Sequence, residues 1–398
     1  MFSSLKIRDF RLYWWGGLIS LIGTWLQQVA LSWLVFRLTG SSLLLGLVGF
    51  FSTIPVFLFS LFAGVVADRV QKRQVLIVTQ TLFMISAFVL AILTQFKMIT
   101  TNQIILIAII NGTILAFDGP LRQSMVVEVV GRDNLFNAIV LNSASFNAAR
   151  IIGPAMAGIL IASIGMSGCF YLNGISFLAV IIALGLMHTR SNNLKNKNKF
   201  WQDLSNGLLF IKDNKAIRAL VIMMGVLSLF GISYIILLPV FVSEVFKRGA
   251  QTLGYLMSSM GLGALAASLF LARFSDLRFK GRFLVITLLG FSVILILFGM
   301  TRNYILSLFY IFLMGYFSVT CMAIINTLLQ TSVSDEFRGR VMSAFMFTFL
   351  GLTPFGNLLS GWLAHIIGTP LTISLGGIIC AISISIITFL NPSVFKLT

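Results

Sequence analysis

Long apolar runs follow one another along almost the whole chain and are separated by short polar segments. Each run has about 20 residues, the length that an α-helix needs to cross roughly 30 Å of bilayer hydrocarbon. Only 10% of the 398 residues are charged, whereas about 25% is usual in soluble domains. We therefore predict an all-α membrane protein with twelve spans, at residues 12–36, 42–66, 74–96, 102–124, 138–162, 168–188, 218–242, 252–274, 283–301, 304–328, 341–364 and 371–390.

The only long polar stretch of the chain lies between the sixth and the seventh span and is rich in Lys and Asn. It divides the spans into two sets of six. We expect a six-helix bundle at residues 1–190, a basic linker at 191–217 and a second six-helix bundle at 218–398.

The distribution of Lys and Arg predicts the orientation. If the N-terminus is inside, 22 of the 28 Lys and Arg residues fall in inner segments and five in outer loops, while Arg150 lies within a span. Such an excess is typical of cytoplasmic loops. We expect both termini in the cytoplasm and the chain in the plasma (inner) membrane of a bacterium. The positive charge then faces anionic lipid headgroups rather than nucleic acid.

The first span is too long for a signal-peptide core and lacks a small-residue cleavage site, so we expect it to be retained.

Motifs of several other protein classes are missing from the sequence. It contains no GxxxxGK[ST] run for nucleotide phosphates. Its three cysteines are far apart and it has only two histidines, which argues against a disulfide framework or a metal centre. The spans also lack a Ser/His/Asp set or a pair of carboxylates for acid–base catalysis. We expect no cofactor, no metal and no enzymatic activity.

The two sets of spans share an internal repeat. The segment around Asp68 recurs around Asp276, 208 residues later. With an offset of 203, three glycines in or just after span 5 match three in or just after span 11: Gly153, Gly158 and Gly165 correspond to Gly356, Gly361 and Gly368. In transporters built from such repeats, the substrate site lies near the membrane midplane between the halves.

The loop after span 2, Gly64-Val-Val-Ala-Asp68-Arg69-Val-Gln-Lys-Arg73, resembles the signature loop of the major facilitator superfamily, with Gln71 where glycine is usual. The segment 142–158, the opening Asp9-Phe10-Arg11 and the loop from Leu329 to Arg340 resemble the enterobactin-exporter-like and macrolide-efflux-like branch. The resemblance implies a secondary transporter, usually an exporter coupled to proton entry. We expect it to be a monomer.

The same resemblance implies that the loop is a gating latch that holds the cytoplasmic side shut. The latch residues would be Gly64, Asp68, Arg69 and Arg73, with Asp276 as a weaker second copy. An acidic group can meet the positive end of a helix in one state and leave it in another. The alternative is that these are ordinary solvated charges.

Asp118 is the only acidic residue inside an apolar run. A charged carboxylate in hydrocarbon is costly, so it pairs, takes up a proton or faces water. Asp118 is therefore our first candidate for proton coupling, and an interfacial acid that only caps or pairs is the alternative. Arg150 lies near the midplane of span 5 and stays charged. Its partner would be Asp118 or an anionic group of the substrate. The alternative to a role in the cavity is a structural ion pair that holds the first bundle together.

Gly153, Pro154 and Gly158 match the antiporter-associated motif on span 5 of the resembling family, which favours export over uptake; plain tight packing of the glycines is the alternative. In the resembling fold, spans 1, 4, 7 and 10 line the cavity. The candidate cavity residues on these spans and on span 5 are Thr24, Gln27, Gln28, Asn111, Asn147, Arg150, Tyr234, Tyr310, Met314 and Phe317. Such a mixture suits an amphipathic ligand.

The sequence thus predicts a proton-coupled exporter of a small amphipathic molecule, such as a siderophore, a drug or a lipid-like metabolite. Two alternatives stay open: an importer or uncoupled facilitator of a small metabolite, and a non-transporting membrane sensor or scaffold.

Overall fold

The structure is a computed structural model that describes residues 3–67, 70–188, 209–273 and 279–397. Within these ranges every regular element is a helix. The helices of the first half are η1 (Ser3–Lys6), α1 (Arg8–Thr39), α2 (Ser42–Ala67), α3 (Lys72–Gln95) and α4 (Thr101–Leu186). Those of the second half are α6 (Lys215–Val226), η2 (Leu227–Gly231), α7 (Tyr234–Glu244), α8 (Ala250–Arg273), α9 (Lys280–Met300), α10 (Tyr304–Ser332), α11 (Asp335–Ile367), α12 (Thr369–Leu390) and η3 (Pro392–Lys396).

The helical run α4 contains 86 residues and is broken at two glycines. Gly131 has φ 69° and ψ 177°, and Gly165 has φ 76° and ψ 178°. Positive φ values are readily adopted by glycine and rarely by other residues. The two breaks divide α4 into a first segment (101–130), a middle segment (132–164) and a last segment (166–186), which correspond to predicted spans 4, 5 and 6.

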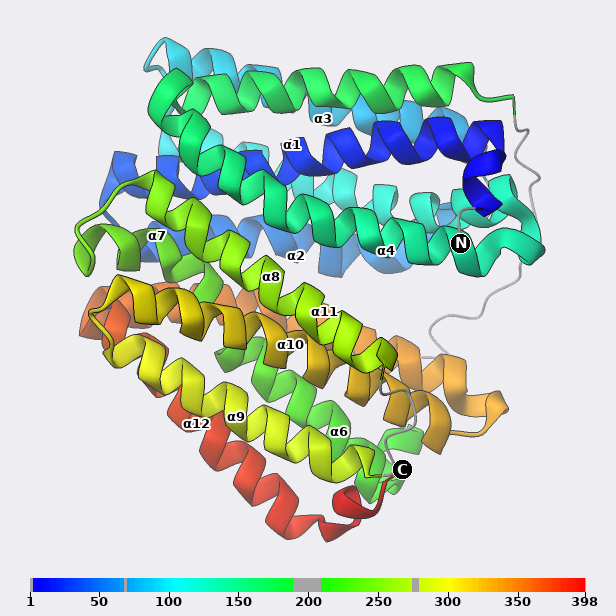
Figure 1. The fold of residues 1–398 in the computed structure, drawn as a ribbon, viewed down its shortest axis with the longest axis vertical. Helices are drawn as coiled ribbons and strands as arrows, with labels where there is room; N and C mark the ends of the chain where they lie inside the picture. The colour runs from blue at the N-terminus through cyan, green and yellow to red at the C-terminus, as the bar shows by residue number, and fades with distance from the viewer. Residues whose placement is uncertain (1–2, 68–69, 189–208, 274–278, 398) are drawn as a thin grey trace. The chain divides into compact units, whose positions relative to one another are not determined.

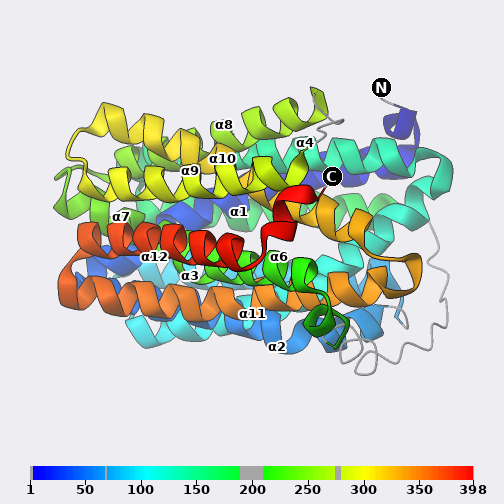
Figure 2. The ribbon, with the colours of Figure 1, turned by 90° about the horizontal axis from the view of Figure 1, so that it is seen from below.

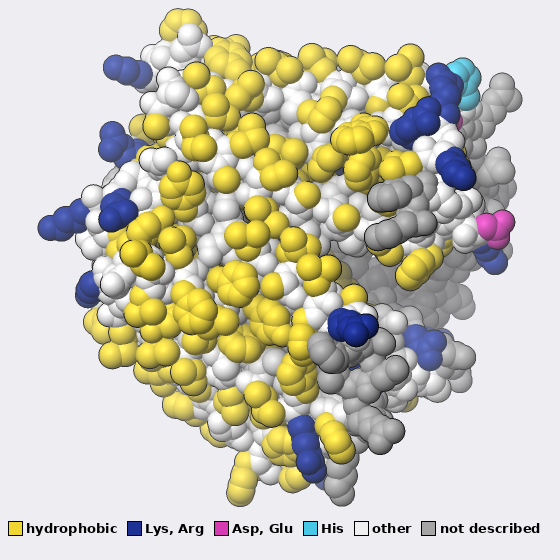
Figure 3. All heavy atoms as spheres, in the orientation of Figure 1, with side chains coloured by type: hydrophobic (Ala, Val, Ile, Leu, Met, Phe, Trp, Pro, Cys, Tyr) yellow, Lys and Arg dark blue, Asp and Glu magenta, His cyan; other side chains and the backbone are white. Residues whose placement is uncertain are grey.

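Ten helical stretches of the described residues are long and apolar enough to cross a membrane, and α4 is one of them. Since α4 contains three segments, these stretches provide the twelve spans expected from the sequence. Within one of them, α6, the π-helical turn η2 and α7 together form span 7. On the face drawn in Figure 3, hydrophobic side chains cover the middle of the helices, and Lys and Arg side chains lie toward helix ends. The all-α membrane fold is confirmed.

Close packing divides the chain into two units. The first contains the chain up to Gly40, α2 from Phe51 onward, α3, α4 and Gly249–Ser258 at the start of α8. The second contains Ser41–Phe50 at the start of α2 and the remaining described residues from 209 onward. The division into residues 1–190, 191–217 and 218–398 stays a prediction.

In the first unit, α1 and α3 both pack along α4 (Figure 1). A buried apolar cluster joins them near the beginning of α1, with Phe10, Leu76, Leu121 and Leu184 each at most 1% exposed. These residues come from α1, α3 and the first and last segments of α4. The cluster therefore fixes the three helices around the polar site described below.

In the second unit, α9 packs against α10 and α12, and the chain returns to α9 through η3 (Figure 2). The amide N–H of Gly281 donates a hydrogen bond of 3.0 Å to the carbonyl oxygen of Leu397. A Cβ atom at position 281 would lie 1.8 Å from the carbonyl oxygen of Val394. Only glycine allows the C-terminal turn to approach α9 this closely.

Candidate functional site

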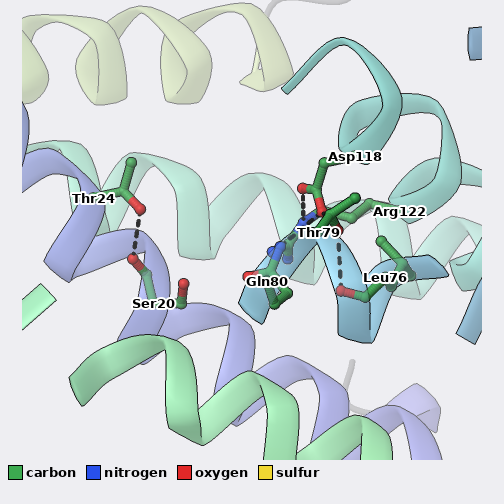
Figure 4. Close-up of polar contacts among 7 residues, drawn as sticks. All are labelled: Ser20, Thr24, Leu76, Thr79, Gln80, Asp118 and Arg122. Carbon is green, nitrogen blue, oxygen red and sulfur yellow. Dashed lines mark hydrogen bonds and ion pairs between the residues drawn. The ribbon is translucent and has the colours of Figure 1, made fainter. Parts of the chain in front are cut away.

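Asp118 lies on the first segment of α4 and is only 4% exposed. Its Oδ1 accepts a hydrogen bond of 2.7 Å from Thr79 Oγ1 and another of 2.7 Å from Gln80 Nε2. Its Oδ2 accepts from Arg122 Nε at 2.5 Å. Figure 4 shows Thr79 and Gln80 reaching the carboxylate from α3, while Arg122 extends from the same helix as Asp118. The four side chains form one polar cluster between α3 and α4, which we call the Asp118 cluster.

Helical spacing explains how Arg122 reaches Asp118, because residues i and i+4 lie on the same face. Tyr13 of α1 also interacts with the Arg122 side chain. The Arg122 side chain is 25% exposed, whereas that of Asp118 is 5% exposed. The arginine is therefore the member of the pair that has room to move toward solvent, and the carboxylate is the fixed one.

Three donors around one carboxylate stabilise its ionised form, since hydrogen bonds to charged groups are roughly twice as strong as neutral ones. Uptake of a proton would remove the charge that attracts Arg122. The position of Arg122 thus depends on the charge of the Asp118 carboxylate, and this dependence is the chemistry that the arrangement offers.

A second ion pair joins α3 to α4. The Nζ of Lys72 donates to Glu128 Oε1, and the side chains are 4% and 16% exposed. The next residue, Arg73, donates through Nε to the carbonyl of Leu184 and through NH2 to that of Gly185, both at 2.6 Å. These carbonyls end the last segment of α4, where helical carbonyls lack partners. In this structure Arg73 is therefore a C-terminal cap within the first unit.

The other residues expected in the latch give less structural information. Gly64 lies in α2. Asp68, Arg69 and Asp276 lie outside the described residues. The latch remains a prediction.

Arg150 and Asn147 lie on the middle segment of α4, and both side chains are partly buried. Asn147 Nδ2 donates to the carbonyl of Ser143 at 2.9 Å. On the same segment, the ring of Phe146 is 5.8 Å from that of Trp25, and a Cβ at Gly153 would lie 2.5 Å from Trp25 Cβ. This part of the middle segment thus packs against α1 at Trp25.

The polar residues of α1 face different surroundings. Gln27 Oε1 accepts a hydrogen bond of 2.7 Å from Asn173 Nδ2 of the last segment of α4. Thr24 is exposed and donates to the carbonyl of Ser20 at 2.9 Å, as Figure 4 shows, and Gln28 is exposed too. Asn111, on the first segment of α4, is partly buried, and its Oδ1 has no hydrogen-bond partner among the described residues.

The candidates of the second unit are mostly packed between helices. The Tyr234 hydroxyl donates to Met260 Sδ at 3.3 Å. Met314 is fully buried, and the ring of Phe317 lies against Gly290 of α9. Tyr310 is partly exposed. Tyr310 and Phe317 are thus the two of these four that are not buried.

The second unit also contains an open, apolar cavity of about 460 Å³, which we call the α11 groove. Leu43 of α2 and Leu229 of η2 contribute to its wall, together with Phe355, Leu358, Leu359 and Trp362 of α11. The four α11 residues recur at helical spacing, so they share one face. Phe355 and Trp362 are each 48% exposed. The volume is within the range of about 300–1,000 Å³ typical of ligand pockets.

The span-5 motif makes a close helix contact. A Cβ at Gly254 of α8 would lie 2.4 Å from the carbonyl oxygen of Pro154, and the Cα of Gly158 is 3.0 Å from the same position. Ser258 Oγ, one turn farther along α8, donates to the carbonyl of Ile151 at 2.8 Å. Glycine on both helices is required for this approach.

The second unit contains an equivalent close contact between α2 and α11. A Cβ at Gly46 of α2 would lie 2.8 Å from the carbonyl oxygen of Asn357 and 2.9 Å from the Cα of Gly361. Gly46 and Gly254 are related by the offset of 208, while Asn357 and Gly361 are related to Pro154 and Gly158 by 203. The contact is therefore part of the internal repeat, and Gly165 and Gly368 share a positive φ as well.

Comparison with known proteins identifies the family. The family model of the transmembrane secretion effectors, a group of major facilitator superfamily transporters, matches residues 1–396. The chain belongs to this family. It is therefore a multi-pass membrane transporter and not an enzyme, as the signature loop and the segment 142–158 led us to expect.

Several relatives of the family match over most of the chain. The staphyloferrin A transporter of Staphylococcus aureus (strain NCTC 8325 / PS 47) is 27% identical and covers 93% of both chains. The multidrug efflux pump Tap of Mycolicibacterium fortuitum is 22% identical over 88% of each. The enterobactin exporter EntS of Shigella boydii serotype 4 is 21% identical, covering 83% of this chain and 79% of its own.

Solved structures of major facilitator transporters share the fold. A D-xylose–proton symporter matches with a TM-score of 0.76 at 14% identity, over 98% of both chains. A bacterial homologue of the human lysosomal transporter Spinster matches with a TM-score of 0.75 at 12% identity, also over 98% of both. At these identities the likeness concerns the fold alone.

Sequence reasoning missed the partners of Asp118 in this transporter. Arg122 is one of the 22 basic residues that we assigned to inner segments, although its i+4 spacing from Asp118 is visible in the sequence. Thr79 and Gln80 lie 39 and 38 residues away, and only the packing of α3 on α4 brings them to the carboxylate. The sequence signal for this contact was Gln80, a polar residue within the apolar run 74–96.

Proposed function

We propose that this protein exports a small amphipathic molecule by proton antiport, with Asp118 as the coupling carboxylate. The observation that carries the proposal is the buried Asp118–Arg122 ion pair within a membrane-spanning segment. A charged pair at such a place is costly to keep and commonly marks an ion or substrate pathway.

Coupling follows from the competition between a proton and Arg122 for the carboxylate. Proton uptake neutralises Asp118 and loosens Arg122, whose side chain is 25% exposed. Proton release restores the pair. If one alternative is preferred in each of two conformations, the proton gradient biases the exchange between them. Alternating access would then occur by rocking of two halves, with residues 1–190 and 218–398 as the moving bodies and the Asp68 and Asp276 loops as latches.

For the cargo, we propose a siderophore first and an amphipathic drug second, because the relatives named above are transporters of these two kinds. Arg150 would contact an anionic group of the cargo. Thr24, Gln28 and Tyr310 would offer hydrogen bonds.

The orientation and location are part of the same proposal. The excess of Lys and Arg in alternate loops supports cytoplasmic termini and a place in the bacterial plasma membrane. The contacts at Gly158 and Gly254 support export, since the matching motif of the resembling family is associated with antiporters. We propose that the monomer is the working unit.

The test uses inverted membrane vesicles that contain the full chain, with iron-free staphyloferrin A and ethidium as probes. An acidic lumen should drive accumulation of a probe, and addition of that probe should release protons from the lumen. Asp118→Asn should abolish proton release. The matched control is Asp213→Asn, which removes an exposed carboxylate just before α6. Intact coupling in Asp118→Asn would exclude Asp118 as the proton carrier.

The same experiment separates the alternatives. An uncoupled facilitator would equilibrate a probe with no dependence on luminal pH. An importer driven by proton symport would empty preloaded inverted vesicles when their lumen is acidic. A sensor or scaffold would move neither probe under any gradient.

A further inference from the structure

The two α3 residues of the Asp118 cluster differ from ordinary ion-pair partners because neither carries a charge. Gln80 is fully buried and Thr79 is 6% exposed. Each has both a donor and an acceptor in its side chain, whereas Arg122 has only donors. Thr79 and Gln80 are therefore the members of the cluster that can bond to Asp118 with or without its proton.

The Thr79 hydroxyl has two acceptors within reach. Its hydroxyl lies 2.7 Å from Asp118 Oδ1 and 3.0 Å from the carbonyl oxygen of Leu76. A hydroxyl group has one proton and can donate it to only one of these acceptors at a time. When the proton points to Leu76, the Thr79 oxygen presents a lone pair to the carboxyl group.

Gln80 has an unused acceptor beside the same carboxyl group. Its Nε2 donates to Asp118 Oδ1, while its buried Oε1 has no hydrogen-bond partner among the described residues. A half-turn of the amide exchanges these two atoms. The oxygen would then face Asp118 Oδ1, where it can accept a hydrogen bond from a protonated carboxyl but not from a carboxylate.

Besides α3, two helices place charged or titratable groups near the Asp118 carboxyl. Helix α1 provides Tyr13, and α4 itself provides Arg122. On α3, Lys72 lies two turns before Thr79 and is paired with Glu128. The α3 side of the carboxyl thus consists of Thr79 and Gln80, and these two decide which protonation states that side can accommodate.

We infer that Thr79 and Gln80 are positioning residues that reverse their hydrogen bonds when Asp118 takes up a proton, so that the neutral acid is held in the place of the carboxylate. The inference rests on the proposed coupling role of Asp118. In the reaction a proton from water adds to Oδ1. The Gln80 amide turns so that its Oε1 accepts a hydrogen bond from the new O–H group, the Thr79 hydroxyl turns to donate its own proton to the Leu76 carbonyl in a hydrogen bond, and Oδ2 becomes a neutral carbonyl oxygen that holds Arg122 weakly.

The test needs no substrate. The full-length protein in lipid vesicles is titrated from pH 9 to pH 4 and followed by infrared difference spectroscopy, in which a protonated carboxyl gives its own C=O stretching band. The band that Asp118→Asn removes, and Asp213→Asn keeps, belongs to Asp118. Thr79→Val and Gln80→Met preserve side-chain size and remove the reversible hydrogen bond, and Thr79→Ser restores the hydroxyl.

We expect the Asp118 band to appear in Thr79→Val and Gln80→Met at a pH about one unit higher than in the wild type. A hydrogen bond to a carboxylate is stronger than one to the neutral acid, so its loss favours protonation. The band should also move to higher frequency, because the acid loses an acceptor for its proton. Thr79→Ser should match the wild type in both respects.

The outcomes separate this inference from the function on which it rests. No Asp118 band at any pH would overturn both, because the residue would then stay ionised. An Asp118 band whose pH and frequency are unchanged in Thr79→Val and Gln80→Met would leave Asp118 as proton carrier and refute the role of its α3 partners. Equal shifts in Thr79→Val and Thr79→Ser would also refute it, because the effect would then come from packing.

Discussion

The carbonyl oxygen of Pro154 faces Gly254 so closely that a Cβ atom at position 254 would lie 2.4 Å away from it. Real Cβ atoms do not approach a backbone oxygen to this distance, so one of the two helices would have to move. The contact joins the middle segment of α4 to the first turns of α8, and Gly46 with Asn357 repeats it.

Gly254→Ala should therefore destabilise the protein by about 1–3 kcal/mol, the usual cost of overpacking. The measurement is the unfolding temperature of the purified protein in detergent. Gly17→Ala is the matched control, because that helical glycine has nothing within 4 Å of the added methyl group. It should be neutral or slightly stabilising, since alanine has the better helix propensity. Equal melting temperatures for both variants would contradict the close contact.

Arg122→Gln should destabilise the first unit more than the double variant Asp118→Asn with Arg122→Gln. The single change leaves a buried carboxylate without its charged partner, at a cost of about 3 kcal/mol. Neutralising both residues removes that charge as well. A double-mutant cycle on unfolding free energies measures the difference, and additive effects would mean that the two side chains do not act as a pair.

Arg73→Lys should loosen the end of the last α4 segment. Lysine cannot donate to two carbonyls in the fixed geometry of a guanidinium, so the bonds to Leu184 and Gly185 would be weakened. Hydrogen exchange followed by mass spectrometry should rise in a peptide that covers residues 180–188. Arg11→Lys, at an exposed position of α1, should leave the same peptide unchanged. Equal exchange in both variants would rule out the cap.

Gly281→Ala should detach the C-terminal turn from α9, because the new Cβ would lie 1.8 Å from the Val394 carbonyl oxygen. We expect faster hydrogen exchange in residues 392–397 and a lower unfolding temperature. Gly339→Ala, where nothing lies within 4 Å, is the control for a glycine-to-alanine change in the same unit. A C-terminal turn that stays protected in Gly281→Ala would contradict the packing described.

Hydropathy predicted the spans well because the bilayer requires the same length of apolar helix everywhere. The expected span 42–66 is Ser42–Ala67 in the structure, and 371–390 is Thr369–Leu390. It failed where a helix leaves the hydrocarbon without ending. Residues 125–130, Met-Val-Val-Glu-Val-Val, lie beyond the expected span 102–124, yet they continue α4 up to Gly131.

The candidate site was harder to predict, since side-chain direction depends on which helices pack together. Met314 and Phe317 have the composition of a cavity wall, but they are buried or packed against α9. Asp118 was recognisable because an acid in an apolar run is rare. Its contact with Gln80 joins residues 38 positions apart and has no signature in either local segment.

The single-residue breaks at Gly131 and Gly165 leave the chain no slack between the three segments of α4. One residue added at either break would rotate the following segment by about 100° and shift it by about 1.5 Å, unless the turn absorbed it. Asp118, Arg150 and Asn173 lie on successive segments, so their relative depths are fixed by the length of this one continuous run. Insertion scanning should therefore find these two junctions among the least tolerant positions of the chain, although both lie between spans, where natural proteins usually vary in length.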